Sequence, residues 1–158
     1  MPTRLMSQWC MTLCVLMGLI NGVPAMAESC HVSTAALAFG AYNTASPAPL
    51  DVMGSLDLHC SNKVHAELSL SVGNGTGASY SGGRKMTRAG GSNTLTYNLY
   101  ADAARTRVLG DGTHGSVTLK INSNKNNYSQ TIWGRLPGGQ TSALPGNYQD
   151  MVVATVSY

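Results

Sequence analysis

The sequence predicts an all-β protein built as an antiparallel sandwich, and three observations carry this prediction. Apolar and polar residues alternate in run after run along the chain, as in half-buried strands. Stretches rich in glycine, asparagine and proline separate these runs. No window of a dozen residues after residue 27 has helical periodicity with capping residues. Short strands separated in this way are typical of two packed antiparallel sheets.

Six runs carry the alternation. Each places apolar side chains on one face and polar side chains on the other, and the apolar faces together form the expected core. The runs are 55–60, 64–72, 94–100, 116–121, 128–136 and 148–158.

The first 27 residues are expected to be a cleaved secretory signal. Arg4 is the only charged residue before Glu28, a mostly apolar run follows, and Ala25 and Ala27 match the small residues of a cleavage site. Cleavage after Ala27 leaves 28–158 as one exported domain. An uncleaved membrane anchor is the alternative, which the short, glycine-interrupted apolar run disfavours.

Cleavage also removes Cys10 and Cys14 and leaves two cysteines, Cys30 and Cys60. An exported chain with two cysteines most simply forms one disulfide. The chain entropy removed by closing this loop corresponds to roughly 3–4 kcal/mol. A zinc site is disfavoured, because neither cysteine lies in a CxxC motif or near histidines at ligand spacing.

The formal net charge of +3 implies no particular partner. A nucleic-acid-binding protein would carry a denser basic cluster than the glycine-rich stretch 82–91, whose three positive charges are interpreted as solvated loop charges. No nucleic-acid partner is therefore expected.

The sequence contains no recognisable catalytic, cofactor or metal motif, and none of these sites is expected. There is no G-x-S-x-G elbow, and the stretch 73–77 (GNGTG) lacks the lysine and helix of a phosphate loop. His59 and His65 could approach each other across a hairpin, but they are interpreted as solvent-facing strand residues. His114 lies in a turn with Asp111.

Trp133 and Arg135 are expected on one face of a strand, with Ile132 on the other. An exposed tryptophan beside an arginine could contact a sugar or a protein partner. The alternative is that Trp133 packs under a loop or against the second sheet.

Five stretches together resemble the spore coat protein U domain family, which includes subunits of archaic chaperone–usher pili. The match spans nearly all of 28–158 in the expected order, and the blocks L-x-Y-x-L-Y-x-D, G-R-L-P and G-x-Y-x-D are specific in combination. They are CHVSTAALAFGAY (30–42), GSLDLHC (54–60), RKMTRAGGSNTLTYNLYADAARTRVLGDGT (84–113), TIWGRLPGGQ (131–140) and LPGNYQDMVVATVSY (144–158).

The resemblance implies an incomplete immunoglobulin-like antiparallel sandwich with one disulfide, which lacks its final strand. A periplasmic chaperone would lend a strand to the open groove, and at an outer-membrane usher another pilus subunit would replace that strand. The terminal strand 151–158 would be one wall of the groove. Its strand-accepting and chaperone-contacting side chains would be Val152, Ala154, Val156 and Tyr158.

The chain departs from the family at its beginning, because only Glu28 and Ser29 stand between the predicted cleavage site and Cys30. Polymerising relatives carry about a strand's length of donor residues there. We therefore expect a non-enzymatic subunit that crosses the periplasm to a surface fibre of adhesion and biofilm, accepts a strand, and occupies the tip. The alternatives are a module that binds carbohydrates or abiotic surfaces, a self-complemented coat-like protein that folds alone, and a hydrolase.

Overall fold

A computed structural model describes residues 29–34 and 36–158 and shows an all-β fold. All the strand ladders are antiparallel, and no helix occurs in the described ranges. Consequently, these ranges contain no helix that could cross a membrane. The strands are β1 (Cys30–Thr34), β2 (Leu50–Cys60), β3 (Val64–Leu70), β4 (Arg84–Arg88), β5 (Thr94–Tyr100), β6 (Leu119–Ser123), β7 (Asn127–Leu136), β8 (Tyr148–Gln149) and β9 (Ala154–Ser157).

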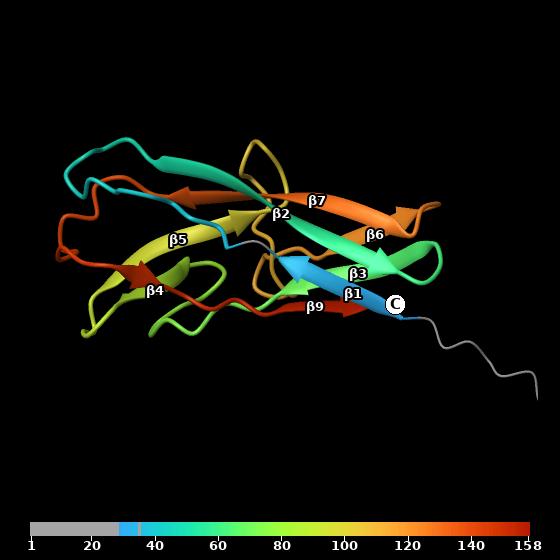
Figure 1. Ribbon diagram of the computed structural model, residues 1–158. Helices are drawn as coiled ribbons and strands as arrows, with labels where there is room; N and C mark the ends of the chain where they lie inside the picture. The colour runs from blue at the N-terminus through green and yellow to red at the C-terminus, as the bar shows by residue number, and fades with distance from the viewer. Residues whose placement is uncertain (1–28, 35) are drawn as a thin grey trace, which may run out of the picture.

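The strands form two sheets. The larger sheet has the order β1-β2-β7-β5-β4-β8, and the smaller has the order β6-β3-β9. Figure 1 shows an elongated molecule in which β2 and β7 run side by side along its length, while β1 passes close to β9. β1 and β8 are the outer strands of the larger sheet, and β9 is an outer strand of the smaller sheet.

The alternation seen in the sequence has the predicted physical meaning. In β5, Leu95, Tyr97 and Leu99 are buried, while the residues between them are half-buried. The buried side chains of both sheets meet in one core, which confirms the antiparallel sandwich. Its members are Leu56, Leu58, Cys60, Ala66, Leu68, Leu70, Leu95, Tyr97, Leu99, Leu109, Ile121, Ile132, Leu136 and Ala143.

Three details differ from the expected strand pattern. β2 begins at Leu50, earlier than the expected start at residue 55. Its first half pairs with β7, beginning with the register pair of Leu50 and Leu136. The stretch 82–91 contains β4, which pairs with β5. The C-terminal run 148–158 is not one strand, because it pairs with β4 as β8 and with β3 as β9.

The interpretation of 82–91 as a solvated loop is wrong for Arg84, which has no exposed surface. Its guanidinium donates hydrogen bonds to the carbonyls of Ser71, through Nε (3.2 Å) and Nη2 (2.9 Å), and Leu109, through Nη2 (2.7 Å). It also lies over the ring of Tyr80, 5.3 Å from the centroid. Burial lowers the pKa of Arg84, and the nearby Tyr97, Tyr80 and Asp150 oppose that shift.

Candidate functional site

An apolar groove lies where the two sheets are left open. It consists of two adjoining hollows of about 620 and 680 Å³, which share Leu37, Phe39, Met86 and Tyr148. The first hollow reaches the core through Leu56, Leu70, Leu99 and Ile132 and extends along 148–152 to Ala154. The second extends the groove towards Thr44 and Leu144. We call this surface the groove.

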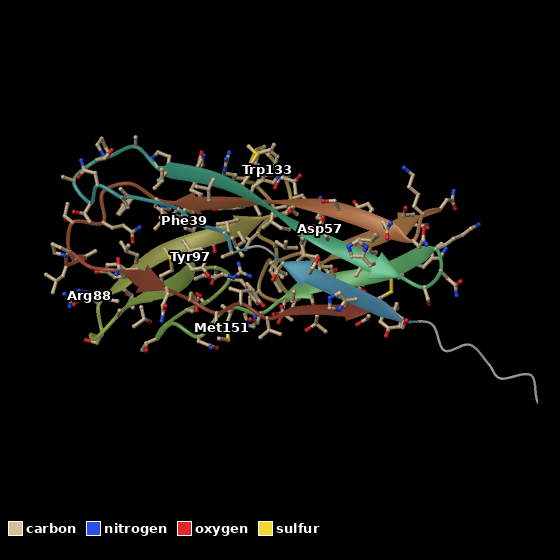
Figure 2. All side chains as sticks on the ribbon, viewed as in Figure 1. Phe39, Asp57, Arg88, Tyr97, Trp133 and Met151 are labelled. Carbon is tan, nitrogen blue, oxygen red and sulfur yellow. A yellow bond between two sulfur atoms is a disulfide. The ribbon has the colours of Figure 1, made fainter. Side chains whose placement is uncertain are left out.

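One wall of the groove is the segment that follows β1. Leu37 and Phe39 point inward here, and a Cβ atom on Gly134 would lie 2.9 Å from Leu37 Cδ2 and 3.0 Å from Phe39 Cζ. Gly134 therefore leaves the space into which both side chains pack. The ring of Phe39 also meets the ring of Tyr97 edge-on, with 5.8 Å between centroids (Figure 2).

The opposite wall is the C-terminal segment, which changes sheets at Asp150. The Asp150 carboxylate accepts hydrogen bonds from the Tyr97 hydroxyl (2.8 Å) and from the backbone N–H groups of Asn74 and Met151 (2.8 Å each). Burial raises the pKa of Tyr97, and the hydrogen bond to Asp150 adds to the shift. A network of polar contacts centred on the half-buried Asp150 therefore holds this wall in place.

Two outer strands reach the groove at their ends, where Thr34 of β1 and Ala154 of β9 line it. β1 is the outer strand of one sheet and β9 is the outer strand of the other, and the two strands touch. An outer strand presents backbone N–H and C=O groups to which another strand can pair. The groove thus combines an apolar floor with backbone hydrogen-bonding groups at its rims, which is what binding of an extended peptide requires.

The four C-terminal residues singled out from the sequence occupy different places. Val152 and Ala154 line the groove. Val156 is half-buried and packs against the core. Tyr158 is 57% exposed and does not line either hollow.

The wall that follows β1, with Leu37 and Phe39, was not predicted from the sequence. The signal was present in LAFGAY (37–42), where apolar residues again alternate. The inward-facing positions here are odd-numbered, Leu37 and Phe39, whereas those of the first strand are even-numbered, Val32 and Thr34. The alternation therefore does not continue from the first strand.

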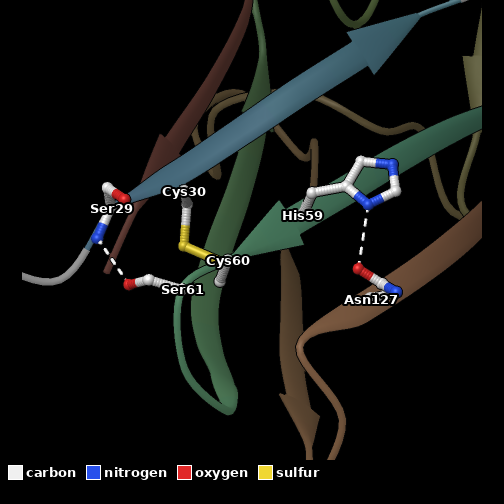
Figure 3. The surroundings of a disulfide bond; sticks show 6 residues. All are labelled: Ser29, Cys30, His59, Cys60, Ser61 and Asn127. Carbon is white, nitrogen blue, oxygen red and sulfur yellow. Dashed lines mark hydrogen bonds between the residues drawn. A yellow bond between two sulfur atoms is a disulfide. The ribbon is translucent and has the colours of Figure 1, made fainter.

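The disulfide between Cys30 and Cys60 is formed, as predicted, with the Cα atoms 4.0 Å apart. The two cysteines are register partners at one end of the β1–β2 ladder (Figure 3). Cys60 is buried in the core, so the disulfide ties the edge strand β1 to the core. This fixes one border of the groove.

Trp133 and Arg135 share the outer face of β7, as expected, but both already have partners. Arg135 makes a bidentate pair with Asp51 (2.7 and 2.8 Å), and Arg105 lies over the Trp133 ring at 5.5 Å. Arg105 Nε is also 3.3 Å from Asp51 Oδ1, an ion pair that lacks hydrogen-bond geometry. Trp133 therefore packs beneath a side chain of the loop after β5, and the groove does not include it.

His59 and His65 are exposed strand residues, as interpreted from the sequence, and they lie in different sheets. His65 is the register partner of Asn122 in the smaller sheet, whereas His59 lies in the larger sheet between His31 and Asn127. His114 stays within its turn and contacts Thr113, whose hydroxyl donates to Asp111. Residues 29–34 and 36–158 contain no group of three or more histidine, cysteine, aspartate or glutamate side chains that could hold a metal ion.

These features define a class of protein: a disulfide-bonded antiparallel β-sandwich whose two sheets stay open along an apolar groove. The Spore Coat Protein U domain model matches residues 16–155, so the chain belongs to that family. This confirms the resemblance read from the sequence.

Two solved structures of pilus subunits are similar to this chain. One is the CsuC–CsuE chaperone–tip adhesion subunit pre-assembly complex from the archaic chaperone–usher Csu pili of Acinetobacter baumannii, with 18% identity and a TM-score of 0.59. The match covers 84% of this chain and 40% of that one, so this chain spans less than half of its length. The P pilus rod subunit PapA is similar at 14% identity and a TM-score of 0.49, over 82% and 98% of the two chains. Comparison with curated proteins gives no match.

Proposed function

We propose that this protein is a non-enzymatic structural subunit of a chaperone–usher surface fibre, and that its groove accepts a strand from a partner. The observation that carries the proposal is the groove itself, with unpaired strand edges at its rims and an apolar floor of the right chemistry for alternating side chains. Membership of the Spore Coat Protein U family and the fold shared with a chaperone-bound pilus subunit support it.

In this proposal the protein is exported by the signal at 1–27, which lies outside the described residues. A periplasmic chaperone fills the groove first, and an adjacent subunit then replaces the chaperone at an outer-membrane usher. The finished fibre stands on the cell surface. Val152 and Ala154 contact the incoming strand directly, while Val156 and Tyr158 extend the same wall towards the chain end.

Two neighbouring valines allow a matched test. Val152 is half-buried and lines the groove, whereas Val153 is 56% exposed and points away from it. We expect Val152→Lys to abolish co-purification with the co-expressed cognate chaperone, because it places a charge on an apolar surface. Val153→Lys should leave co-purification intact. Equal recovery of the chaperone with both variants would count against a strand-accepting groove, as would a cooperative, monomeric melt of the protein prepared without a chaperone.

We further propose a terminal position, at the fibre tip. The support is the short predicted lead before Cys30, since two residues cannot fill a groove that a strand of about 5–6 residues occupies. N-terminal sequencing of the exported protein tests the lead, and immunogold labelling tests the position. Label along fibre shafts, or a cleavage site well before Ala27, would overturn the tip assignment. The proposal that the groove accepts a strand would be unaffected.

A further inference from the structure

We propose that His31 and His59 form a binding site for one divalent transition-metal ion on the outer face of the larger sheet. The two histidines are direct register partners in the β1–β2 ladder, so their side chains leave the sheet on the same face. Both residues are exposed. The site lies away from the groove, so the proposal stands independently of the strand-accepting function.

The register pairing brings the two histidine backbones close enough for both imidazoles to reach one ion. At the end of the ladder, Ser61 N–H donates to the Ser29 carbonyl (2.9 Å), and the next pair, Cys30 and Cys60, has the short Cα separation of a non-hydrogen-bonded pair. Hydrogen-bonded and non-hydrogen-bonded pairs alternate, so His31 and His59 form a hydrogen-bonded pair with Cα atoms about 5.5 Å apart. Two imidazole nitrogens at that spacing can each reach about 2.0–2.1 Å from one ion.

A third residue orients the ring of His59 for this role. His59 Nδ1 lies 2.9 Å from Asn127 Oδ1, as Figure 3 shows. An amide oxygen only accepts, so Nδ1 carries the proton and donates it, and the lone pair is left on Nε2. Metal-binding histidines are held in the same way, by an acceptor on the nitrogen that does not bind the ion.

The disulfide holds the two histidine-bearing strands in a fixed position relative to each other. Cys30 and Cys60 are the adjacent register pair, and the buried side chain of Cys60 occupies the opposite face of the sheet. The covalent link therefore fixes the relative position of the two strands one residue away from the two histidines. A metal ion meets ligands that need little further ordering, which favours binding.

Within the two nearest outward rows of the sheet, the charge beside the pair is negative. His31, His59 and Asn127 form one outward-facing row across three strands, and the next outward-facing row is Ser33, Asp57 and Ser129. Asp57 is the one acidic residue in these two rows. Asp57 supplies negative potential rather than a ligand, because the described residues hold no cluster of three metal-binding side chains. Water would complete the coordination. Two imidazoles with water suit Cu²⁺ best, ahead of Zn²⁺ and Ni²⁺.

Copper titration of the exported protein tests the site, with glycine as a competing chelator and with any co-purified chaperone kept identical between samples. We expect one Cu²⁺ site whose affinity falls at least tenfold in His31→Gln and in His59→Gln. His65→Gln is the matched control, because it removes an exposed strand histidine from the other sheet and should change nothing. Asn127→Ala should weaken binding by roughly tenfold while both ligands remain.

Electron paramagnetic resonance gives a readout that a change in fold would not imitate. The wild-type copper spectrum should show coupling to two imidazole nitrogens, and each glutamine variant should show coupling to one. Copper affinity unchanged in His31→Gln, or a single-nitrogen spectrum for the wild type, would overturn the proposal.

Discussion

Tyr97 and Asp150 meet at the wall of the groove, with the phenol oxygen 2.8 Å from the carboxylate Oδ2. β8 ends at Gln149 and β9 begins at Ala154, so this carboxylate stands where the C-terminal chain passes from one sheet to the other. Its other oxygen accepts the backbone N–H groups of Asn74 and Met151. The Tyr97–Asp150 hydrogen bond therefore anchors the course of the chain along the groove.

Replacing Tyr97 by phenylalanine should lower the free energy of unfolding by about 1–2 kcal/mol at neutral pH. The substitution keeps the buried ring but leaves the carboxylate of Asp150 without one of its donors. Urea denaturation measures the loss. Tyr128→Phe is the matched control, because among the described residues that hydroxyl bonds only the nearby side chain of Gln130, so its removal should cost much less. Equal losses of unfolding free energy in the two variants would show that the hydrogen bond to Asp150 contributes no more stability than the one to Gln130.

The same pair predicts a loss of stability at alkaline pH. Burial and the bond to Asp150 raise the pKa of Tyr97 above the value of about 10 found in unfolded chains. A raised folded pKa means that the stabilisation is complete below pH ~10 and declines as the pH rises further. Between pH 9.5 and 11 the wild type should therefore lose stability more steeply than Tyr97→Phe. Burial also raises the pKa of Tyr80, so some slope will remain in the variant; identical slopes would contradict the prediction.

Arg84→Ala should destabilise the protein by about 2–5 kcal/mol, because it leaves a cavity and removes the donors that satisfy the carbonyls of Ser71 and Leu109. Arg88→Ala is the control from the same strand. Arg88 is half-buried and donates through Nε to the Pro145 carbonyl, so its loss should cost about 1 kcal/mol. Chemical denaturation compares the two variants, and a small effect at Arg84 would mean that its burial is energetically unimportant.

The sandwich and its disulfide could be predicted because their signals are local. Alternation along β5 identifies a half-buried strand without knowledge of its neighbours, and two cysteines in an exported chain leave one pairing. β4 could not be predicted in this way. Its strand RKMTR is mostly polar, and Arg84 becomes a core residue only because carbonyls from two distant segments receive its guanidinium.

The groove was predictable on one side only. The alternating C-terminal residues marked Val152 and Ala154, but the break before β9 depends on contacts of Asp150 with Tyr97 and Asn74, which are distant in sequence. Packing of Leu37 beside Gly134 is likewise a tertiary contact. Sequence periodicity describes strands singly, whereas the groove arises from how strands from both ends of the chain meet.

Gly134→Ala should disturb the groove wall. The added methyl group would lie 2.9 Å from Leu37 Cδ2 and Val52 Cγ2, closer than side chains tolerate, so Leu37 must move. We expect a loss of about 1–3 kcal/mol, as for other overpacked cores. Gly54→Ala is a graded control, since the three atoms nearest to its methyl group all belong to Leu37, the closest at 3.1 Å. Thermal melts of both variants should show the larger decrease for Gly134→Ala, and the reverse order would contradict the packing argument.

Asp51→Asn should have a small effect that depends on pH and salt. The hydrogen bond from Arg135, with a lesser contribution from Arg105, lowers the pKa of Asp51. A lowered folded pKa gives stability that is present above pH ~4 and is lost as the pH falls. The variant should cost less than about 1 kcal/mol at pH 7 and nothing in 1 M salt or at low pH, because exposed ion pairs are weak and screened. Asp57→Asn, which breaks no ion pair among the described residues, provides the control in denaturation measured at each pH.

Removing the disulfide should release one border of the groove while leaving the centre of the larger sheet folded. Cys30 and Cys60 close a loop with a sequence separation of 30, so the double variant Cys30→Ser/Cys60→Ser should lose roughly 3–4 kcal/mol. β1 is an outer strand held along one side by β2, whereas β2 also pairs with β7 over ten register positions from Leu50 to His59. Hydrogen exchange should therefore accelerate at 31–34 far more than in β7. The control Ser29→Ala/Ser61→Ala removes the neighbouring hydroxyls and keeps the covalent link, and it should leave protection at 31–34 nearly unchanged. Equal acceleration in β1 and β7 would mean that the disulfide stabilises the whole fold rather than this edge.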